Sequence, residues 1–337
     1  MTKTPSRVWI RFRRNRKGFC SLCVFGALFV MSLFAEFIAN DKPLLMAYNG
    51  KLYFPVLHNY SELTFGGEFD IDADYRDPYI KGLIKNNGWL LMPIISFSYD
   101  TINYNLSRPA PSPPSSENPL GTDDRGRDIA SRLLYGFRIS MIFALILTFF
   151  SSIIGVMLGA MQGYYGGAFD IIMQRFMEVW SGLPELFILI ILASVIAPSF
   201  WTILIITLLF GWMKLVGLVR AEFLRCRNFE YVLSARAMGM SNLRIMFVHI
   251  LPNALNSTLS YLPFILAGGI TTLTSLDFLG FGLPTGSPSL GELLSQGKAN
   301  LQSPWIGISV FVVLALTLSL LVFIGEALRD AFDPRRA

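Results

Sequence analysis

Long apolar runs are the feature that most constrains this chain. Six runs approach the ~20 residues that an α-helix needs to cross a membrane, and they cover residues 19–39, 138–160, 183–198, 200–219, 256–277 and 305–326. Charged residues make up only 15% of the chain, against roughly 25% in soluble proteins. We therefore predict an all-α membrane protein with six transmembrane helices. The same composition excludes a cytosolic enzyme, a disordered chain and a disulfide scaffold.

Two of these runs carry interruptions. The third and fourth are separated only at Pro198, Ser199 and Phe200, which predicts a tight helical hairpin. The fifth contains Pro263 and a Gly268-Gly269 pair, which predict a break or kink. Neighbouring helices can satisfy the backbone groups that such a break frees.

The first run follows a strongly basic segment. Seven bases precede it and no acid occurs before Glu36; they are Lys3, Arg7, Arg11, Arg13, Arg14, Arg16 and Lys17. A secretory signal also starts this way, but a run of 21 residues exceeds a typical signal core and lacks a clear cleavage site. Removing the seven bases from the net charge of +5 leaves −2, so the excess indicates a cytoplasmic flank and no nucleic-acid partner. We predict a cytoplasmic segment 1–18, an uncleaved helix 19–39 and, after six crossings, a cytoplasmic tail 331–337.

Residues 40–119 then fall on the periplasmic side. This insertion between the first and second helices holds nine acids, six bases and twelve aromatic residues. About eighty residues are marginal for an independent core, so we expect it to pack on a partner or on the membrane domain. It closes with the stiff spacer PAPSPPSS at 109–116.

The loop 220–254 should carry two short amphipathic helices on the cytoplasmic face. Asn228 can cap the first helix, and Tyr231, Ala235 and Met238 share one of its faces. Gly239 is expected to end that helix.

Ser241 can cap the second helix, and Pro252 is expected to stop it. Its apolar stripe is Leu243, Met246, Phe247 and Ile250. A plain interfacial loop is the alternative interpretation of this segment.

The same segment resembles a signature of ABC importer permeases, EAA-x3-G-x9-I-x-LP. Gly239, Leu251 and Pro252 match it, while Leu233, Ser234 and Ala235 stand at the EAA positions and His249 at the Ile position. The fuller string EYV-x-SARAMG…HILPN is similar to the peptide-permease branch, whose usual residue types here are Glu230, Tyr231, Arg236 and His249.

Three further strings resemble dipeptide and oligopeptide permeases in the same order. They are LGTDDRGRDIASRLLYGFRIS at 120–140, SLDFLGFGLP at 275–284 and IGEALRDAFDP at 324–334. The long aromatic segment with its DKPLL start resembles the microcin C-type peptide importer permeases.

The resemblance implies the type I ABC importer permease fold, with residues 138–330 as the transmembrane domain. It implies one half of a heterodimeric peptide importer in a bacterial inner membrane, with lipid around it. The partners would be a second permease, ABC ATPase subunits, a periplasmic substrate-binding protein and a peptide substrate. ATP and Mg²⁺ would bind to the ATPase, and this chain would hold no cofactor. The residues implied in ATPase docking are Glu230, Tyr231, Ser234, Ala235, Arg236, Gly239, His249, Leu251 and Pro252.

No enzymatic constellation stands out in the sequence. A P-loop needs G-x4-G-K-[ST], but GELLSQGKAN has five residues between Gly291 and Gly297, and Ala299 follows the lysine. The chain has two histidines, no HExxH motif and a C-x-x-C pair inside an apolar run, so we predict no catalytic and no metal site. A membrane enzyme is therefore disfavoured. The alternative is an ion-gradient-driven secondary transporter, but the middles of four of the runs lack the acids that such transporters use.

Some ionisable residues lie near the predicted membrane. Asp277, near the outer mouth of the fifth run, could meet a peptide ammonium in the substrate pathway. A helix-end hydrogen bond or a partner arginine is the alternative. Lys214 falls within a turn or two of the inner end of the fourth run and is expected to snorkel to water.

A charged cluster opens the interfacial amphipathic segment 120–137. Its members are Asp123, Asp124, Arg125, Arg127 and Asp128. Three carboxylates also fit a metal site, but the interleaved arginines favour internal ion pairs. We expect a gating or binding-protein docking role here.

Overall fold

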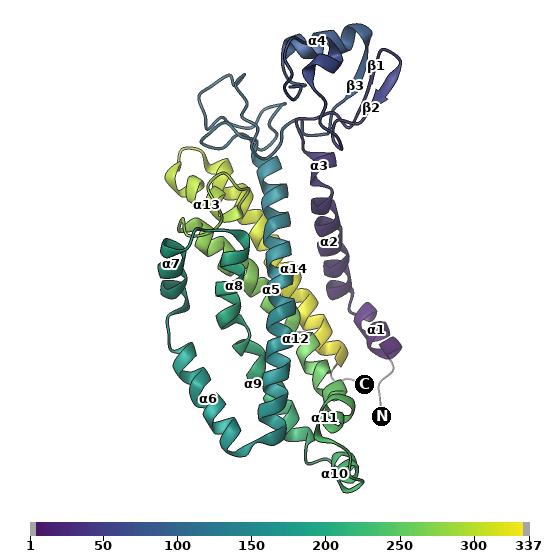
Figure 1. The fold of residues 1–337 in the computed structure, drawn as a ribbon, viewed down its shortest axis with the longest axis vertical. Helices are drawn as coiled ribbons and strands as arrows, with labels where there is room; N and C mark the ends of the chain where they lie inside the picture. Colours follow the sequence, from purple (N-terminus) through teal and green to yellow (C-terminus); the bar gives the residue numbers. More distant parts are fainter. Residues whose placement is uncertain (1–4, 333–337) are drawn as a thin grey trace. The chain divides into compact units, whose positions relative to one another are not determined.

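The structure, a computed structural model, describes residues 5–332 and is mainly helical (Figure 1). The predicted tail 331–337 therefore lies mostly outside the described residues. In chain order the helices before the long apolar ones are α1 (Pro5–Arg14), α2 (Arg16–Leu33), α3 (Ala35–Ile38), the 3₁₀ turn η1 (Glu62–Phe65) and α4 (Pro78–Asn87). They are followed by α5 (Ile129–Tyr165), α6 (Gly167–Ser181), α7 (Glu185–Val195), α8 (Phe200–Gly211), α9 (Met213–Cys226) and α10 (Glu230–Ala237). The last are α11 (Asn242–Arg244), the π-helical turn η2 (Ile245–Ile250), α12 (Leu251–Phe278), α13 (Leu290–Ala299) and α14 (Pro304–Phe332).

Among the described residues, five helical stretches are long and apolar enough to cross a membrane. They are Arg16–Leu33, Ile129–Tyr165, Phe200–Cys226, Asn242–Phe278 and Pro304–Phe332. These overlap five of the six predicted runs. The remaining run, 183–198, holds only the 11-residue α7, which is too short to cross alone. The count of six is therefore not confirmed by helix length.

The predicted hairpin is confirmed, whereas a break in the fifth run is wrong and a kink there stays a prediction. α7 and α8 lie side by side (Figure 1), with Leu189 and Ile203 in one buried cluster. α12, however, runs unbroken through Pro263 and Gly268. Several of its hydroxyl side chains bond the carbonyl one turn back, as Thr258 does to Ala254, which satisfies these polar groups inside the helix.

Contacts divide the chain into two compact units. Of the described residues, the first unit comprises 5–27, 140–284 and 315–332, and the second comprises 28–139 and 285–314.

The second unit holds a small sheet, so the predicted all-α class was incomplete. β1 (Leu45–Tyr48) pairs antiparallel with both β2 (Lys51–Tyr53) and β3 (Gly88–Leu91), giving the order β2-β1-β3. Asn49 and Gly50 both have positive φ, of 49° and 77°, as the tight hairpin turn requires. The sequence does not predict this sheet, because strands of three or four residues are too short to show a clear alternation of apolar and polar residues.

The aromatic residues of 40–119 build a core of their own in this unit. Phe65 is completely buried, and four tyrosine rings surround it within 6.2 Å between centroids: Tyr48, Tyr53, Tyr60 and Tyr75. Met46, Ile80 and Ile84 complete the cluster. The segment also packs on the start of α5, where Tyr135 donates to the carbonyl of Ala39. The segment thus has a core despite its marginal size, because edge-to-face ring pairs supply one.

Candidate coupling site

The segment that resembles the ABC permease signature forms α10, a glycine turn and a second helix at one end of α12 (Figure 1). Glu230 lies in the first turn of α10, where a negative charge is favourable. The N-cap is Phe229, without a side-chain hydrogen bond, so the predicted Asn228 cap was wrong. An N-terminal acid and packing stabilise this helix instead.

Gly239 ends α10, as predicted. Its φ is +75°, its N–H donates to Arg236 O at 3.0 Å, and the Met240 N–H donates to Ala235 O at 3.2 Å. These two bonds form the Schellman motif, which needs a left-handed residue at this place. No atom lies within 4 Å of where a Cβ would stand. Glycine is therefore favoured by backbone conformation and not by crowding.

The buried face of α10 differs from the predicted one. Val232 and Ala235 are buried, whereas Tyr231 and Met238 are exposed. Val232 and Ala235, three positions apart, face the core. The predicted helical spacing was therefore right, but the predicted face of the helix was wrong.

The second helix does not stop at Pro252. The Leu251 N–H donates to Met246 O, five residues back, which closes a π-helical turn. Pro252 then falls in the first turn of α12, where its missing N–H costs little. Ser241 occupies the predicted N-cap without a side-chain bond.

The wide turn also changes the buried stripe of this helix. Ile245, Met246 and Ile250 are buried, while Leu243 and Phe247 are exposed. A π-turn places more residues in each turn than the α-helical spacing assumes. Two of the four predicted stripe residues were therefore wrong.

One buried cluster fastens these short helices to the long ones. It joins α10 and η2 to α5, α9 and α12 through Tyr164, Phe223, Val232, Ile250 and Ala254, among others. A displacement of α10 must therefore move three long helices with it, because close-packed interiors do not deform freely.

Polar contacts reinforce this attachment. Tyr164 Oη donates to Asn242 Oδ1 at 2.7 Å, and the Arg236 guanidinium lies over the Tyr164 ring at 5.5 Å. Asn253 Nδ2 donates to Tyr231 Oη at 3.0 Å. Tyr231 and Arg236 thus position α10 against its neighbours.

A glycine seam brings α5 against α9. Gly155, Gly159 and Gly163 follow one another at four-residue spacing on α5, and a Cβ at Gly159 would lie 2.8 Å from both Val216 O and Val219 Cβ. Small residues at this spacing let membrane helices approach closely. The glycine spacing that signals this seam is visible in the sequence, although the predicted motifs did not include it.

The predicted docking residues divide between surface and core. Glu230, Ser234, Arg236, Gly239 and Pro252 are exposed, His249 and Leu251 are half-buried, and Ala235 is buried. Large apolar side chains are exposed beside them, with Met238 at 68% and Leu243 at 62%. We call Leu233, Met238, Leu243 and Phe247 the apolar docking face. Exposed apolar groups of this kind indicate a surface that another protein or the membrane covers.

Asp277 lies at the end of α12 and is buried. Its Oδ1 accepts the Leu283 N–H at 2.7 Å, and a Cβ at position 282 would collide with that oxygen. The helix-end hydrogen bond of the alternative interpretation is thus present. A role for Asp277 in the substrate pathway stays a prediction.

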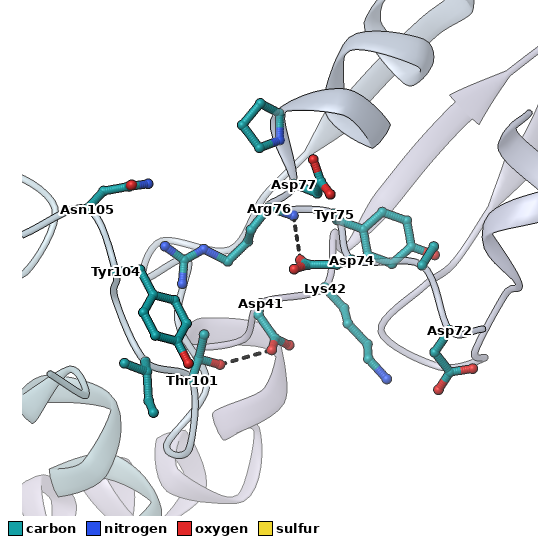
Figure 2. A pocket seen from close by; sticks show the side chains of 13 residues that line it. Asp41, Lys42, Asp72, Asp74, Tyr75, Arg76, Asp77, Thr101, Tyr104 and Asn105 are labelled. Carbon is teal, nitrogen blue, oxygen red and sulfur yellow. Dashed lines mark hydrogen bonds between the residues drawn. The ribbon is translucent and has the colours of Figure 1, made fainter. Parts of the chain in front are cut away.

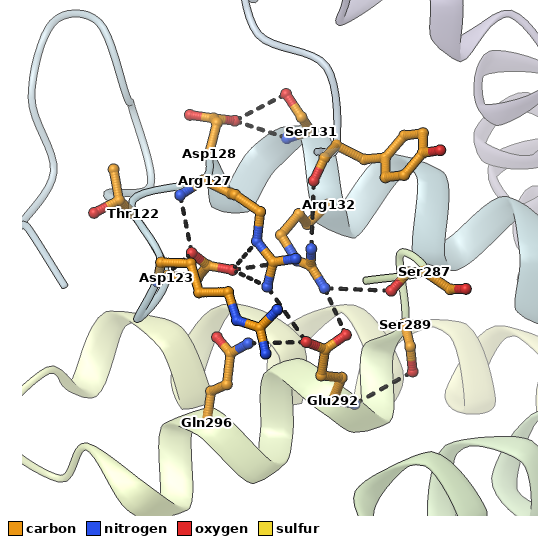
Figure 3. Close-up of polar contacts among 12 residues, drawn as sticks. Thr122, Asp123, Arg127, Asp128, Ser131, Arg132, Ser287, Ser289, Glu292 and Gln296 are labelled. Carbon is orange, nitrogen blue, oxygen red and sulfur yellow. Dashed lines mark hydrogen bonds and ion pairs between the residues drawn. The ribbon is translucent and has the colours of Figure 1, made fainter. Parts of the chain in front are cut away.

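The charged cluster at 120–137 forms internal ion pairs, as expected. Figure 3 shows Arg127 and Arg132 between Asp123 and Glu292. Arg127 contacts Asp123 at 2.7 Å and Glu292 at 3.3 Å; Arg132 contacts Asp123 at 3.5 Å and Glu292 at 2.8 Å. We call these four residues the Asp123 network. Sequence reasoning missed Glu292, because it comes from α13 and nothing in the local pattern connects the two segments.

Asp128 caps α5 beside this network. Its Oδ1 accepts the Ser131 N–H at 2.7 Å and its Oδ2 accepts Asn118 Nδ2 at 2.9 Å. Burial raises the pKa of the Asp128 carboxyl above its ordinary value, and these hydrogen bonds oppose that rise.

The aromatic-rich segment contains a cleft of about 540 Å³ lined by four aspartates (Figure 2). Three of them serve the local fold: Asp41 accepts from Thr101, Asp74 accepts the Arg76 N–H, and Asp77 caps α4. Within residues 5–332, no group of three or more His, Cys, Asp and Glu side chains is arranged to hold a metal ion.

Two family profiles match this chain. The family described as the binding-protein-dependent transport system inner membrane component matches residues 155–337, and the N-terminal transmembrane domain of oligopeptide transport permease C matches residues 6–59. The first match covers more than half of the chain and includes the whole coupling segment. The chain belongs to this family.

It is therefore an inner-membrane permease subunit of an ABC importer, a transport protein whose ATP hydrolysis resides in partner subunits. Membership in this family sets aside the gradient-driven transporter and the membrane enzyme.

Two relatives extend the match over almost the whole chain. The inner membrane ABC transporter permease protein YejE of Escherichia coli is 60% identical over 98% of this chain and 96% of its own. The peptidoglycan transport system permease protein YejE of Agrobacterium fabrum is 51% identical over 99% of this chain and 93% of its own. The aromatic-rich segment is thus part of what these permeases share.

Among solved structures, an inward-facing form of the MetNI methionine ABC transporter is similar in fold. The TM-score is 0.51 at 17% identity, over 60% of this chain and 96% of that chain. This likeness supports the ABC importer permease fold and says nothing of cargo.

Proposed function

We propose that this permease carries peptides or peptide-like compounds inward and that α10 with η2 docks on the ATPase. The matched family of oligopeptide permeases and the peptidoglycan permease relative share peptide chemistry in their cargo. The microcin C-type resemblance of residues 40–119 fits the same cargo class.

The proposed topology has six crossings with both termini in the cytoplasm. α6 and α7 in series, joined at Gly182–Pro184, supply the third crossing that α7 alone is too short to make. The basic residues of α1 and those around α10 then lie on the cytoplasmic side, as the positive-inside rule requires. The sheet-containing segment 40–119 lies in the periplasm, where a binding protein delivers substrate.

The observation that carries the coupling role is the construction of α10. α10, α11 and η2 expose the residues of the apolar docking face, while Val232, Ala235 and Ile250 are buried against α5, α9 and α12. When ATP and Mg²⁺ close the ATPase, a rigid element held on both sides converts that closure into a rigid-body movement of long helices. A second permease completes the pathway.

The test is Gly239→Asp in the assembled importer. Aspartate tolerates the left-handed conformation better than most residues, so the turn and membrane insertion should persist. We expect substrate-stimulated ATP hydrolysis to be lost, because the side chain projects into the ATPase contact. Gly280→Asp is the matched control, since Gly280 also has positive φ and open space for a Cβ.

Stimulated hydrolysis at the wild-type rate in Gly239→Asp would show that α10 is not the coupling element. ATP-driven uptake of a labelled peptide into vesicles that hold the importer tests the cargo separately. Absence of uptake across short peptides of different composition would contradict the peptide assignment.

A further inference from the structure

The junction between α1 and α2 is a bend of defined geometry. α1 leads into α2 (Figure 1), one of the five stretches long and apolar enough to cross a membrane. Between the two helices, the Asn15 N–H donates to Phe12 O at 3.1 Å, and Asn15 Oδ1 accepts the Gly18 N–H at 3.2 Å. Asn15 thus ends one helix and caps the next. We call residues 9–19 the basic elbow.

Packing fastens the basic elbow to the last helix of the chain. Phe12 is completely buried in a cluster with Ala327 and Ala331 of α14. At Gly18, α2 passes so close to Ala327 that a Cβ would collide with it. One face of α1 is therefore covered by the chain itself, and the other faces stay exposed.

The exposed side of the basic elbow concentrates positive charge. Its five bases are Arg11, Arg13, Arg14, Arg16 and Lys17. All but Arg11 are exposed. None of the five forms an ion pair with any side chain that the structure describes. These charges are therefore available to an anion from outside the chain.

Trp9 indicates where the membrane surface lies. Its side chain is 49% exposed, and its ring meets Phe19 edge-on, at 6.2 Å between centroids. Phe19 opens the apolar run 19–39. Because tryptophan is enriched where lipid headgroups meet the acyl chains, this contact places the start of α2 at that boundary. The bases just before Phe19 then lie at the level of the headgroup phosphates.

Helix stability does not account for all of these charges. Three of the bases lie in the last turn of α1, where a positive charge is favourable. Arg16 and Lys17, however, open α2, where a positive charge is unfavourable. The positive-inside rule requires only bases near the span, and a flexible tail would meet it. Exposed bases held in place against a helix dipole therefore favour an external anion.

We propose that the basic elbow binds anionic phospholipids, with its bases on the headgroup phosphates and Trp9 at the edge of the acyl layer. Clusters of roughly four to eight bases beside a spanning helix are typical of such binding. Only 17% of the apolar stretch of α2 is buried by the rest of the chain, so the lipid-facing surface of α2 continues into the elbow. Through Phe12, bound lipid also holds the end of α14. The inference goes beyond the peptide cargo and the docking of α10 and depends on neither.

The test measures quenching of Trp9 fluorescence by brominated lipids in the complete importer, held in nanodiscs. Trp9 is one of six tryptophans, so its signal is taken as the difference between the wild type and Trp9→Phe. Dibrominated phosphatidylglycerol should quench this signal roughly threefold more than dibrominated phosphatidylcholine at the same mole fraction, because each base attracts anionic headgroups. Added salt should reduce this preference, since the charges are exposed.

Variants of the exposed bases assign the preference to the elbow. The triple variant Arg14→Gln, Arg16→Gln, Lys17→Gln spares Arg13, whose guanidinium lies over an aromatic ring at 5.5 Å, and should quench equally with both lipids. The matched variant Arg14→Lys, Arg16→Lys keeps the charge and should keep the preference. Arg175→Gln, at another exposed arginine, should not change it.

Other outcomes overturn the proposal. Equal quenching of wild-type Trp9 by the two lipids would mean that the elbow has no anionic site. Quenching by neither lipid would assign this face to a protein partner such as the ATPase. A full preference in the triple Gln variant would show that these bases do not create it. If that variant does not assemble, a wild-type preference that persists as salt is added would contradict the proposal in the same way.

Discussion

The coupling site and the Asp123 network are held together in opposite ways. Around α10 the contacts are apolar, with Val232, Ala235 and Ile250 buried against long helices and a glycine seam behind them. In the Asp123 network two arginines and two acids share one small volume, and Asp123 and Arg132 are completely buried. Apolar packing has no directional bonds, and its close fit makes α10 move together with the long helices as one body. Buried ion pairs fix one geometry, because displacement leaves a charge without a partner. The proposed coupling segment, which must move, is thus held by apolar packing, whereas the Asp123 network keeps a fixed geometry through ion pairs.

The largest expected effect comes from removing one charge of the network. Arg132→Met deletes contacts to Asp123, Glu292, and the carbonyls of Tyr99 and Ser287. We expect a loss of about 3–5 kcal/mol in the free energy of unfolding, since a buried charge is left unpaired. Denaturation of the purified permease in detergent measures it. Arg108→Met, at an exposed arginine of the same unit, is the control and should change little. Equal stability of the two variants would mean that the network is solvated and does not hold the fold.

The glycine seam should respond more moderately. Gly159→Leu forces a side chain between α5 and α9, where Val216 O and Val219 Cβ leave no room. Overpacking of this kind costs about 1–3 kcal/mol, so the unfolding midpoint should fall less than for Arg132→Met. Gly26→Leu, whose Cβ meets nothing within 4 Å, controls for helix propensity and bulk. A Gly159 variant as stable as the Gly26 variant would show that the two helices do not approach as described.

The smallest effect is a change in pH dependence at Asp128. Burial raises its pKa, so the folded protein binds this proton more tightly than the unfolded chain does. Stability from this group is greatest below the unfolded pKa of about 3.9 and is lost as pH rises through the folded pKa. Asp128→Asn keeps an acceptor for the Ser131 N–H and removes the titration. The thermal midpoint of the wild type should therefore fall relative to that of the variant as pH rises above 4. Parallel curves from pH 4 upward would contradict the raised pKa.

The sequence predicts the membrane class, the position of the two short helices around α10 and the turn at Gly239, because each depends on a local pattern. Apolar runs locate five spanning stretches. Gly239 predicts the end of α10, because glycine adopts the left-handed conformation easily.

What escaped prediction depends on contacts between distant residues. Glu292 joins the network from 160 positions beyond Arg132, and no local pattern links the two. The π-turn at Ile245–Ile250 changes which side chains are buried without any marker residue of its own.

The balance of charges in the Asp123 network also determines how the stability of this region responds to dissolved ions. Two positive and two negative groups give no net charge, and three of the four are at most 4% exposed. Dissolved ions weaken interactions between charges that water reaches and act much less on buried pairs. The start of α5 should therefore keep its stability from dilute to saline media.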